Sequence, residues 1–536
     1  MIRLNQVKLP LDHSDDLLHA YVLNTLSITA EQLADIHIFK RGYDARQRNV
    51  ITLIYTLDVT LKDIDEAAIL ERFVKDPNVR QSPDTHYKYV AQAPQNLTER
   101  PIVIGMGPCG LFTALILAQM GFKPIVLERG KSVHERSKDT FRFWRKGELN
   151  TESNVQFGEG GAGTFSDGKL YSQVKDPNFL GLKVKQEFVT AGAPTEILYV
   201  SKPHIGTFKL VTMVERMRRK IIALGGDIRF ETRVKDLNIE NSQITGVTLN
   251  DGEVINSKHV VLAIGHSARD TIQMLHDKDV YLEAQSFSIG FRIEHKQEVI
   301  DQARFGANAG NPILGSADYK LVHHCKNGRS VYSFCMCPGG VVVGATSEKE
   351  AVVTNGMSQY SRSERNANSA IVVGLSPADF NHDPLQGIAL QRKLERQAYI
   401  LGGSNYDAPA QRVGDFIAGS EAQPYGKVEP SFKASVKMTD LSSSLPDFAI
   451  AAIREALPAF EKKIRGFASP DAMLTGVETR TSSPLQIKRG KDYQSVNVKG
   501  LYPGGEGAGY AGGILSAGID GIKIAEAVAL DMLKTS

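Results

Sequence analysis

The sequence predicts an α/β protein whose main domain is built around a doubly wound parallel sheet. Three observations support this prediction. From Pro101 the chain follows the order strand, glycine turn, helix and strand, which is typical of such a sheet. A strand-rich segment begins near Gln285, and glycine-rich sequence returns after Gly500. The middle of the chain therefore interrupts the sheet domain as a β-rich insertion.

The length of the chain fits this division, because 536 residues exceed what one hydrophobic core normally supports. We expect a small α+β domain over residues 1–95. The sheet domain then takes residues 96–284 and 471–536, and the β-rich insertion takes residues 285–470, where a substrate or cap domain is expected.

Composition excludes several classes of protein. The chain is 42% apolar and 23% charged, with a net charge of +3, which disfavours disorder and gives no strong nucleic-acid signal. Its four cysteines are too few for a secreted disulfide framework. The N-terminal residues do not read as a signal peptide, and no apolar run reaches membrane-spanning length. We therefore expect a cytoplasmic protein with no membrane partner.

The first 95 residues read as a separate unit. A helix is expected around Ser14 to Thr25, with strands at Ile36 to Phe39 and at Val50 to Leu57, where apolar residues alternate. The stretch from Ala91 to Arg100 is polar and contains proline, as linkers do. Basic residues between the strands favour a solvated hairpin, with contact to a phosphate or an acidic partner as the alternative.

A dinucleotide-binding fingerprint opens the sheet domain. A short apolar strand runs into Gly105-x-Gly107-x-x-Gly110, and an apolar helix and a second strand ending at Glu128 follow. In the Rossmann fingerprint the first glycine permits a tight turn and the second lets a pyrophosphate approach. The third lets helix and strand pack closely. The sequence therefore predicts a Rossmann-type nucleotide site.

Two side chains of this fingerprint have specific expected roles. Glu128 is placed to accept both hydroxyl hydrogens of an adenosine ribose, which disfavours a 2′-phosphate and hence NADP at this site. Cys109 lies inside the fingerprint. Its side chain either packs beneath the phosphate turn or forms a thiolate stabilised by the helix N-terminus.

Two dense glycine segments indicate which dinucleotide binds. Five glycines fall among the eleven residues from Gly158 to Gly168, the first glycine segment. Six fall among the ten from Gly504 to Gly513, the second glycine segment. Such segments let backbone lie against a phosphate or a flat ring, as FAD requires. The helix after the second segment points its positive end at the anion that forms on a reduced flavin.

At these motifs the chain resembles FAD-dependent oxidoreductases of the glutathione-reductase-like Rossmann superfamily, and within it the FAD-dependent dehydrogenase family. The narrower resemblance rests on GEGGAGTFSDGKL, on SFCMCPGG from Ser333 and on TNGMS from Thr354. It implies bound FAD. Fingerprint, glycine segments and resemblance together predict cofactor contacts at Gly105, Gly107, Pro108, Cys109, Gly110, Glu128, Arg129, Gly161, Ala162, Gly163, Thr164, Val234, Ala263, Gly265, Gly505, Glu506, Gly512, Gly513 and Ile514.

Two positions differ from the superfamily pattern. Ile264 stands in place of a common threonine, and Glu506 stands in place of the aspartate that binds the ribityl chain. The chain also has no second GxGxxG between Gly130 and Gly500. Electrons therefore come either from the substrate itself or from NADH or NADPH, a candidate transient donor that binds by another route.

Candidate catalytic residues are Glu478, Arg480 and Cys337. Glu478 and Arg480 alternate just before the chain re-enters the sheet domain, where Arg480 would hold an anionic substrate and Glu478 would handle a proton. A structural ion pair is the alternative. Cys335 and Cys337 would share one face of a regular strand but lie too far apart for an easy disulfide, unless a turn at Pro338 to Gly340 bends them together.

Either these cysteines line the substrate pocket or the core, or they perform redox or nucleophilic chemistry. His204 and His266 are further acid–base candidates, with hydrogen-bonded structural histidines as the alternative. We predict no metal ligands. The expected activity is hydride transfer between flavin N5 and an organic substrate or nicotinamide. The alternatives are a monooxygenase, and a flavoprotein whose FAD is structural or redox-sensing and whose N-terminal domain docks on RNA or protein.

Overall fold

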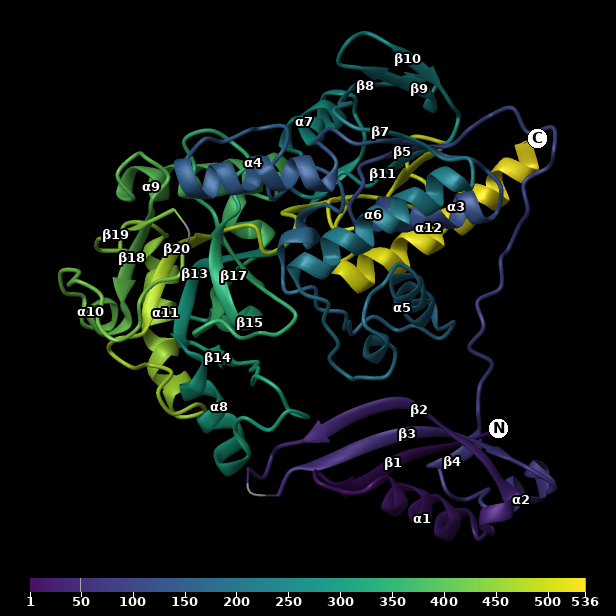
Figure 1. Ribbon diagram of the computed structural model, residues 1–536. Helices are drawn as coiled ribbons and strands as arrows, with labels where there is room; N and C mark the ends of the chain where they lie inside the picture. Colours follow the sequence, from purple (N-terminus) through teal and green to yellow (C-terminus); the bar gives the residue numbers. More distant parts are fainter. Residues whose placement is uncertain (49, 433, 536) are drawn as a thin grey trace.

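The computed structural model describes residues 1–48, 50–432 and 434–535, so the last residue of the predicted 471–536 segment lies outside it. Three units are visible in Figure 1: an N-terminal sheet at the bottom, a large sheet on the left, and a helix-rich unit at the upper right. The predicted mixed α/β fold with a parallel sheet is confirmed.

The N-terminal unit has a βαββαβ order. Its antiparallel sheet has the strand order β2-β3-β1-β4, the ferredoxin-like arrangement. The Ser14 side chain accepts a hydrogen bond from Leu17 N and so caps the first helix, which explains why that helix begins there. The elements are β1 (Ile2–Pro10), α1 (Asp15–Leu26), β2 (Leu33–Asp44), β3 (Thr52–Leu61), α2 (Glu66–Arg72) and β4 (Val79–Gln81).

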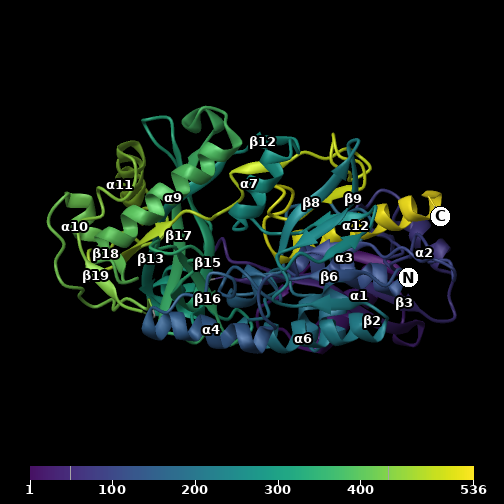
Figure 2. The same cartoon turned by 90° about the horizontal axis from the view of Figure 1, so that it is seen from above.

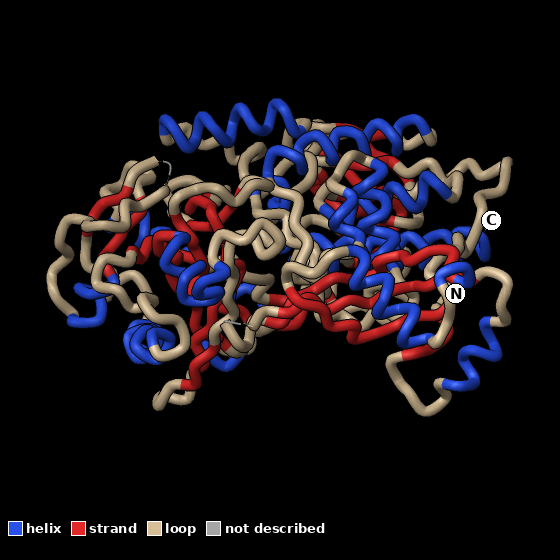
Figure 3. The backbone as a smooth tube through the Cα atoms, turned by 60° about the horizontal axis from the view of Figure 1, so that its bottom comes forward, coloured by secondary structure: helices blue, strands red, loops and turns tan. Residues whose placement is uncertain are grey.

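The N-terminal sheet packs against the rest of the chain. Figure 1 shows α1 and α2 on its far side, and Figure 3 shows its strands reaching toward the large sheet. The Phe39 ring lies 6.3 Å from the Phe179 ring, and Arg41 forms a backbone bridge with Val200. Residues 82–101 contain no helix or strand, and the predicted linker, Ala91 to Arg100, lies within them.

The central unit contains the parallel sheet. Its strands are β5 (Ile102–Ile104), β6 (Ile125–Leu127), β7 (Asp227–Arg229), β11 (Val260–Leu262) and β22 (Leu501–Pro503), in the order β22-β11-β5-β6-β7. Strand β22 comes from the far end of the chain, so the sheet domain is discontinuous. The helix α3 (Pro108–Gln119) is almost entirely buried, since it packs against both α6 (Thr207–Ala223) and α12 (Ile514–Thr535).

Further elements surround this sheet. Figure 2 shows α4 and α6 along one side of the molecule and α7, α9 and β12 along the other. A small antiparallel sheet has the order β10-β9-β8. These elements are α4 (Val133–Lys146), α5 (Leu180–Thr190), α7 (Arg269–Asp277), β8 (Val234–Glu240), β9 (Gln243–Leu249) and β10 (Val254–Asn256).

The middle of the chain forms a large sheet with the order β14-β15-β17-β13-β20-β18-β19, and β16 pairs with β15. This sheet includes β20, which follows residue 470. Its elements are β13 (Phe287–Lys296), α8 (Gln297–Phe305), β14 (Val322–His324), β15 (Ser330–Gly344), β16 (Thr354–Ser358), β17 (Asn366–Leu375), α9 (Pro384–Leu401), β18 (Ala408–Arg412), α10 (Val413–Ala418), β19 (Val436–Met438), α11 (Asp447–Glu461) and β20 (Met473–Glu478).

The pair β12 (Leu282–Ala284) and β21 (Leu485–Ile487) joins the two connections between the units. In β13, Phe291 packs on the Phe416 ring, whereas the alternate residues Arg292 and Glu294 are also fully buried. This strand is therefore buried on both faces, and its charged residues need partners inside the protein.

The turn at Pro338 to Gly340 that would bend Cys335 and Cys337 together is not formed. Strand β15 runs through these residues without turning. The register with β17 instead shifts between Phe334 and Cys337 and again between Cys337 and Gly340. The extra residues therefore form bulges inside a continuous strand, which pairs with β17 both before and after them.

Candidate functional site

The fingerprint and both glycine segments lie against one another. A Cβ added to Gly161 of the first segment would lie 2.8 Å from the Cα of Gly107. One added to Gly505 of the second segment would lie 2.8 Å from the Cβ of Cys109. The glycines therefore permit close backbone packing, and three distant parts of the sequence form one site.

The fingerprint loop has the geometry that its glycines predict. Gly105 has a φ of 95°, and a Cβ on Gly110 would lie 2.0 Å from the Gly105 carbonyl oxygen. The Ala263 carbonyl closes the other side of this turn, 2.4 Å from a Cβ on Gly105. Gly107 is the N-cap residue of α3 and provides no side-chain cap. The first amides of the helix are therefore available to an anion such as a pyrophosphate.

One side of the site is open. An added Cβ would meet no atom within 4 Å at Gly265, Gly512 or Gly513. His266 Nε2 is buried without a hydrogen-bond partner, while its Nδ1 lies 3.2 Å from Glu506 Oε1. An open cradle beside an unpartnered buried nitrogen is what a bound polar cofactor would fill, so these residues fit FAD.

Another part of the first glycine segment lies beside Ile514, the residue that follows the second segment. Ala162, Gly163 and Thr164 lie in a 3₁₀ turn that spans Ala162–Phe165. The Ile514 side chain at the start of α12 lies 3.0 Å from a Cβ placed on Gly163, and Pro108 lies beside it. The turn therefore places the N-terminus of α12 next to that of α3.

Glu128 holds the adenosine end of the site together. Its Oε2 accepts from Met106 N, and its Oε1 accepts from both Gly130 N and Gly158 N, each at 2.9 Å. A carboxylate offers about four acceptor positions. Three are taken by backbone amides, so room remains for about one ribose hydroxyl rather than the predicted two.

A cavity of about 280 Å³ lies at this end, and its lining includes Arg233, the residue before Val234, which begins β8. Arg129 lines the cavity but is held by ion pairs with Glu152 at 3.0 Å and Asp270 at 2.9 Å. Its guanidinium also stacks on the Phe157 ring. The cavity is lined by Arg129, Lys131, Asn150, Glu152, Ser153, Glu231, Arg233 and Asn250.

The surroundings of two candidate side chains, Cys109 and His204, favour a structural role. Cys109 is buried against the second glycine segment, and burial raises the pKa of its thiol, which disfavours a thiolate. His204 stacks on Tyr360, and its Nε2 lies 2.9 Å from the Tyr360 carbonyl oxygen. Burial and the charge of Arg362 lower the pKa of His204 to about 4, so this imidazole is neutral at pH 7.

Sequence reasoning missed Arg136, which holds the first glycine segment in place. Its side chain is fully buried in α4 and stacks on Phe165. The sequence does indicate that Arg136 is buried, because it follows Val133 by three residues and so lies on the apolar face of an amphipathic helix. Its guanidinium donates, at 2.6 to 3.3 Å, to the carbonyl oxygens of Asn154, Val155, Gly158, Glu159 and Gly161.

Replacing Arg136 with lysine is expected to lower the free energy of unfolding by about 2 kcal/mol, because one ammonium cannot reach five carbonyl groups. Denaturant unfolding measures this loss. Arg142→Lys is the matched control, since Arg142 is exposed on the same helix. Equal midpoints for the two variants would contradict the role given to Arg136.

Glu478 and Cys337 lie on either side of Arg292. The Arg292 Nη1 is 3.2 Å from Glu478 Oε1, and its Nη2 is 3.4 Å from Cys337 Sγ. Thr354 Oγ1 donates to the other carboxylate oxygen at 3.4 Å. Burial, partly offset by Arg292, raises the pKa of Glu478 to about 7. A carboxyl group with this pKa can hold or release a proton near neutral pH.

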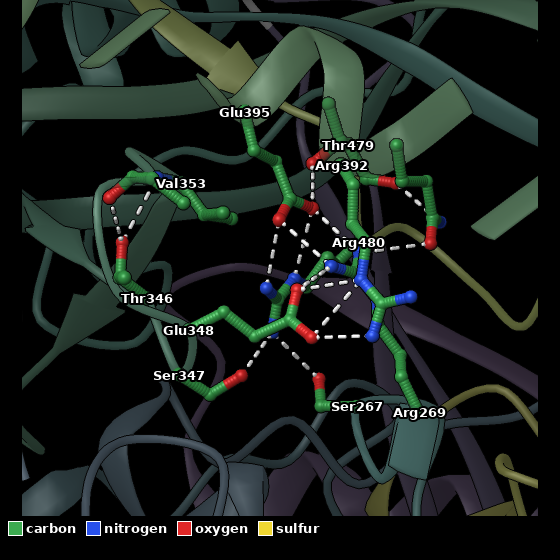
Figure 4. Close-up of polar contacts among 12 residues, drawn as sticks. Ser267, Arg269, Thr346, Ser347, Glu348, Val353, Arg392, Glu395, Thr479 and Arg480 are labelled. Carbon is green, nitrogen blue, oxygen red and sulfur yellow. Dashed lines mark hydrogen bonds and ion pairs between the residues drawn. The ribbon is translucent and has the colours of Figure 1, made fainter. Parts of the chain in front are cut away.

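Arg480 lies in a different cluster and does not contact Glu478. Figure 4 shows its guanidinium against Glu395, a carboxylate that it shares with Arg269. Its Nε and Nη2 donate to Glu395, and its Nη1 donates to Ser267 Oγ and Ser347 Oγ. Only one of the five N–H groups of an arginine is then left. This geometry favours a structural ion pair, with Glu395 rather than Glu478 as the partner.

The fold and the glycine-lined site fit a dinucleotide-binding protein, and comparison with known families supports FAD as the dinucleotide. Residues 286–481 match the family described as FAD-dependent protein, C-terminal domain-like, and residues 206–287 match flavin containing amine oxidoreductase. Residues 1–60 match a domain of unknown function.

A Clostridium beijerinckii protein described as uncharacterized is 44% identical over 527 residues, which cover 98% of each chain. The chain belongs to the same family as that protein. The matches to an FAD-dependent protein and to a flavin containing amine oxidoreductase support an FAD-dependent oxidoreductase.

Solved structures show a more distant likeness. L-proline dehydrogenase from P. horikoshii is 15% identical, with a TM-score of 0.35, over 80% of this chain and 93% of that one. A geranylgeranyl bacteriochlorophyll reductase-like protein from Thermoplasma acidophilum is 12% identical, with a TM-score of 0.34, over 82% and 79%. Among the described residues, no helix is long and apolar enough to cross a membrane.

Proposed function

We propose that the chain transfers a hydride between FAD and an organic substrate or nicotinamide, with the cofactor lying across the two glycine segments as in glutathione-reductase-like flavoproteins. The observation that supports this most is the packing of both segments on the fingerprint loop, beside the uncapped N-terminus of α3. FAD, when bound, supplies a ring that takes up or releases a hydride.

The chain's own groups have separate tasks in this proposal. The first amides of α3 bind the pyrophosphate, and Glu128 orients the adenosine ribose. The N-terminus of α12 favours negative charge near Gly512 and Ile514. The predicted contacts at Glu506 and Gly265 belong to the ribityl side of the same cradle. Glu478 holds the proton that accompanies the hydride, and Arg292 fixes its position.

Glu478→Gln is expected to remove a pH dependence of stability. The pKa of Glu478 rises from its usual 4.5 to about 7 on folding, so the folded state keeps a proton that the unfolded state releases. This contribution is complete below pH 4.5 and is lost as pH rises to about 7. Relative to the variant, the natural chain loses on the order of 3 kcal/mol of unfolding free energy across this range.

Unfolding free energies of both proteins between pH 4.5 and 8 check this expectation. Glu421→Gln, at an exposed position, serves as the control and should follow the natural chain. Parallel curves for Glu478→Gln and the natural protein would show that the carboxyl group does not carry the buried proton.

Anaerobic titration of the FAD-loaded protein with NADH and with NADPH tests the electron donor. We expect one of them, or an organic substrate, to bleach the flavin bands, and a defined acceptor to restore them. Oxygen incorporation into product would instead favour the monooxygenase. Flavin bands that no donor in the series bleaches would favour a structural or sensing flavin. In that alternative the N-terminal domain docks on RNA or protein, but part of its sheet already contacts the rest of the chain through Phe39 and Arg41.

A further inference from the structure

Cys335 and Cys337 lie at a bulge in β15 that brings their thiols together. In a regular strand, residues two apart are separated by about 7 Å. Here the register shifts between Phe334 and Cys337, and Cys335 has a φ of 46°, in the left-handed region. As a result the Cys337 thiol turns back toward Cys335 and donates to its carbonyl oxygen at 3.4 Å. The two side chains are therefore closer than in a regular strand, and a hydrogen bond between them shifts the pKa values of both thiols.

Two cations lie against this pair. Arg292 Nη2 is 3.4 Å from Cys337 Sγ and donates to the Cys335 carbonyl at 2.6 Å. Lys169 Nζ is 3.7 Å from Cys337 Sγ and 3.1 Å from Asp167. The hydrogen bond from Cys337, together with the charges of Lys169 and Arg292, holds the pKa of the Cys335 thiol well below its usual value. The same hydrogen bond and burial raise the pKa of Cys337.

The two thiols also differ in access. Cys335 is partly exposed, and its neighbour Phe334 is 36% exposed, whereas Cys337 is fully buried. Cys109 and Cys325 are buried as well. A reagent from solution therefore reaches Cys335 first. A partly exposed thiolate beside a second, protonated thiol is the arrangement of an attacking and a resolving cysteine.

We propose that Cys335 and Cys337 form a redox-active dithiol that reduces low-molecular-weight disulfides. The Cys335 thiolate attacks one sulfur of the external disulfide, breaks its S–S bond and releases one thiolate. That thiolate takes the proton of Cys337. Cys337 then attacks the Cys335 sulfur and releases the second thiolate. The dithiol is oxidised to a disulfide and the external disulfide is reduced, so two electrons are exchanged and no other oxidant is needed.

The test treats the purified full chain with hydroxyethyl disulfide and follows intact mass and free thiols after unfolding. The natural protein should lose two of its four thiols and about 2 Da, without an adduct. Cys337→Ser should instead trap one hydroxyethyl adduct at Cys335. Cys335→Ser should form neither product, and Cys325→Ser should behave like the natural chain.

Lys169→Met supplies a second readout that leaves both thiols in place. Without the cation, disulfide formation should slow by about tenfold at pH 7. Four free thiols with no adduct in the natural chain, or a stable adduct without an internal disulfide, would overturn the proposal. Flavin absorbance of the same samples reports FAD separately, so failure here is distinguishable from failure of the proposed hydride transfer.

Discussion

Replacing Glu395 with alanine is expected to destabilise the protein by about 3 to 5 kcal/mol, because removing one partner of a buried ion cluster leaves uncompensated charges. Glu395 is fully buried and accepts from both Arg269 and Arg480 at 2.7 to 3.0 Å. Thr479 Oγ1 donates to it at 2.9 Å. No other carboxylate reaches Arg480 among the ion pairs of the described residues.

The same cluster joins the two large units. Arg269 begins α7 of the parallel-sheet unit, whereas Glu395 lies in α9 of the inserted segment (Figure 4). Denaturant unfolding measures the loss, and Arg396→Ala on the same helix is the control. Arg396 pairs with Glu350 at the surface, where such pairs contribute about 0 to 1 kcal/mol. A loss within 1 kcal/mol for Glu395→Ala would show that the buried arginines do not depend on this carboxylate.

Gly512→Leu is expected to weaken FAD binding by about 1,000-fold, or roughly 4 kcal/mol, without harming the fold. An added Cβ at Gly512 meets no atom within 4 Å, and its φ is outside the left-handed region. The leucine side chain would therefore occupy space that the protein leaves open and that we assign to the cofactor. Fluorescence titration with FAD measures the affinity.

Gly374→Leu is the matched control for this experiment. Gly374 also meets no atom within 4 Å of an added Cβ, but it lies in β17 of the large sheet. Its variant should bind FAD like the natural chain. Equal FAD affinity in the Gly512 variant would show that the second glycine segment does not face the cofactor.

Local features were predictable from the sequence. The fingerprint specifies β5, the turn and α3 through neighbouring residues alone, so these elements agree with prediction. The dense glycines predict that backbone approaches a cofactor, and this stays a prediction; the packing of Gly161 on Gly107 shows that they also let two backbone segments approach each other. Ser14 gave the start of α1, because its side chain caps the helix from the adjacent position.

Long-range partners were not predictable. Glu478 and Arg480 are two residues apart, yet their partners Arg292 and Glu395 lie far away in sequence and on different elements. No local pattern encodes which distant charge a buried residue will meet. The bulge at Cys335 was missed for a related reason, because it depends on the register with β17 rather than on the strand's own sequence.

FAD binding by the purified full chain tests the assignment of the glycine-lined site. Equilibrium titration followed by flavin absorbance and fluorescence should show one FAD per chain, with the spectral changes of a flavin removed from water. The same experiment on Gly512→Leu should show FAD binding weakened by about 1,000-fold. A natural protein that is colourless as purified and binds no added FAD would contradict the assignment of the glycine-lined site.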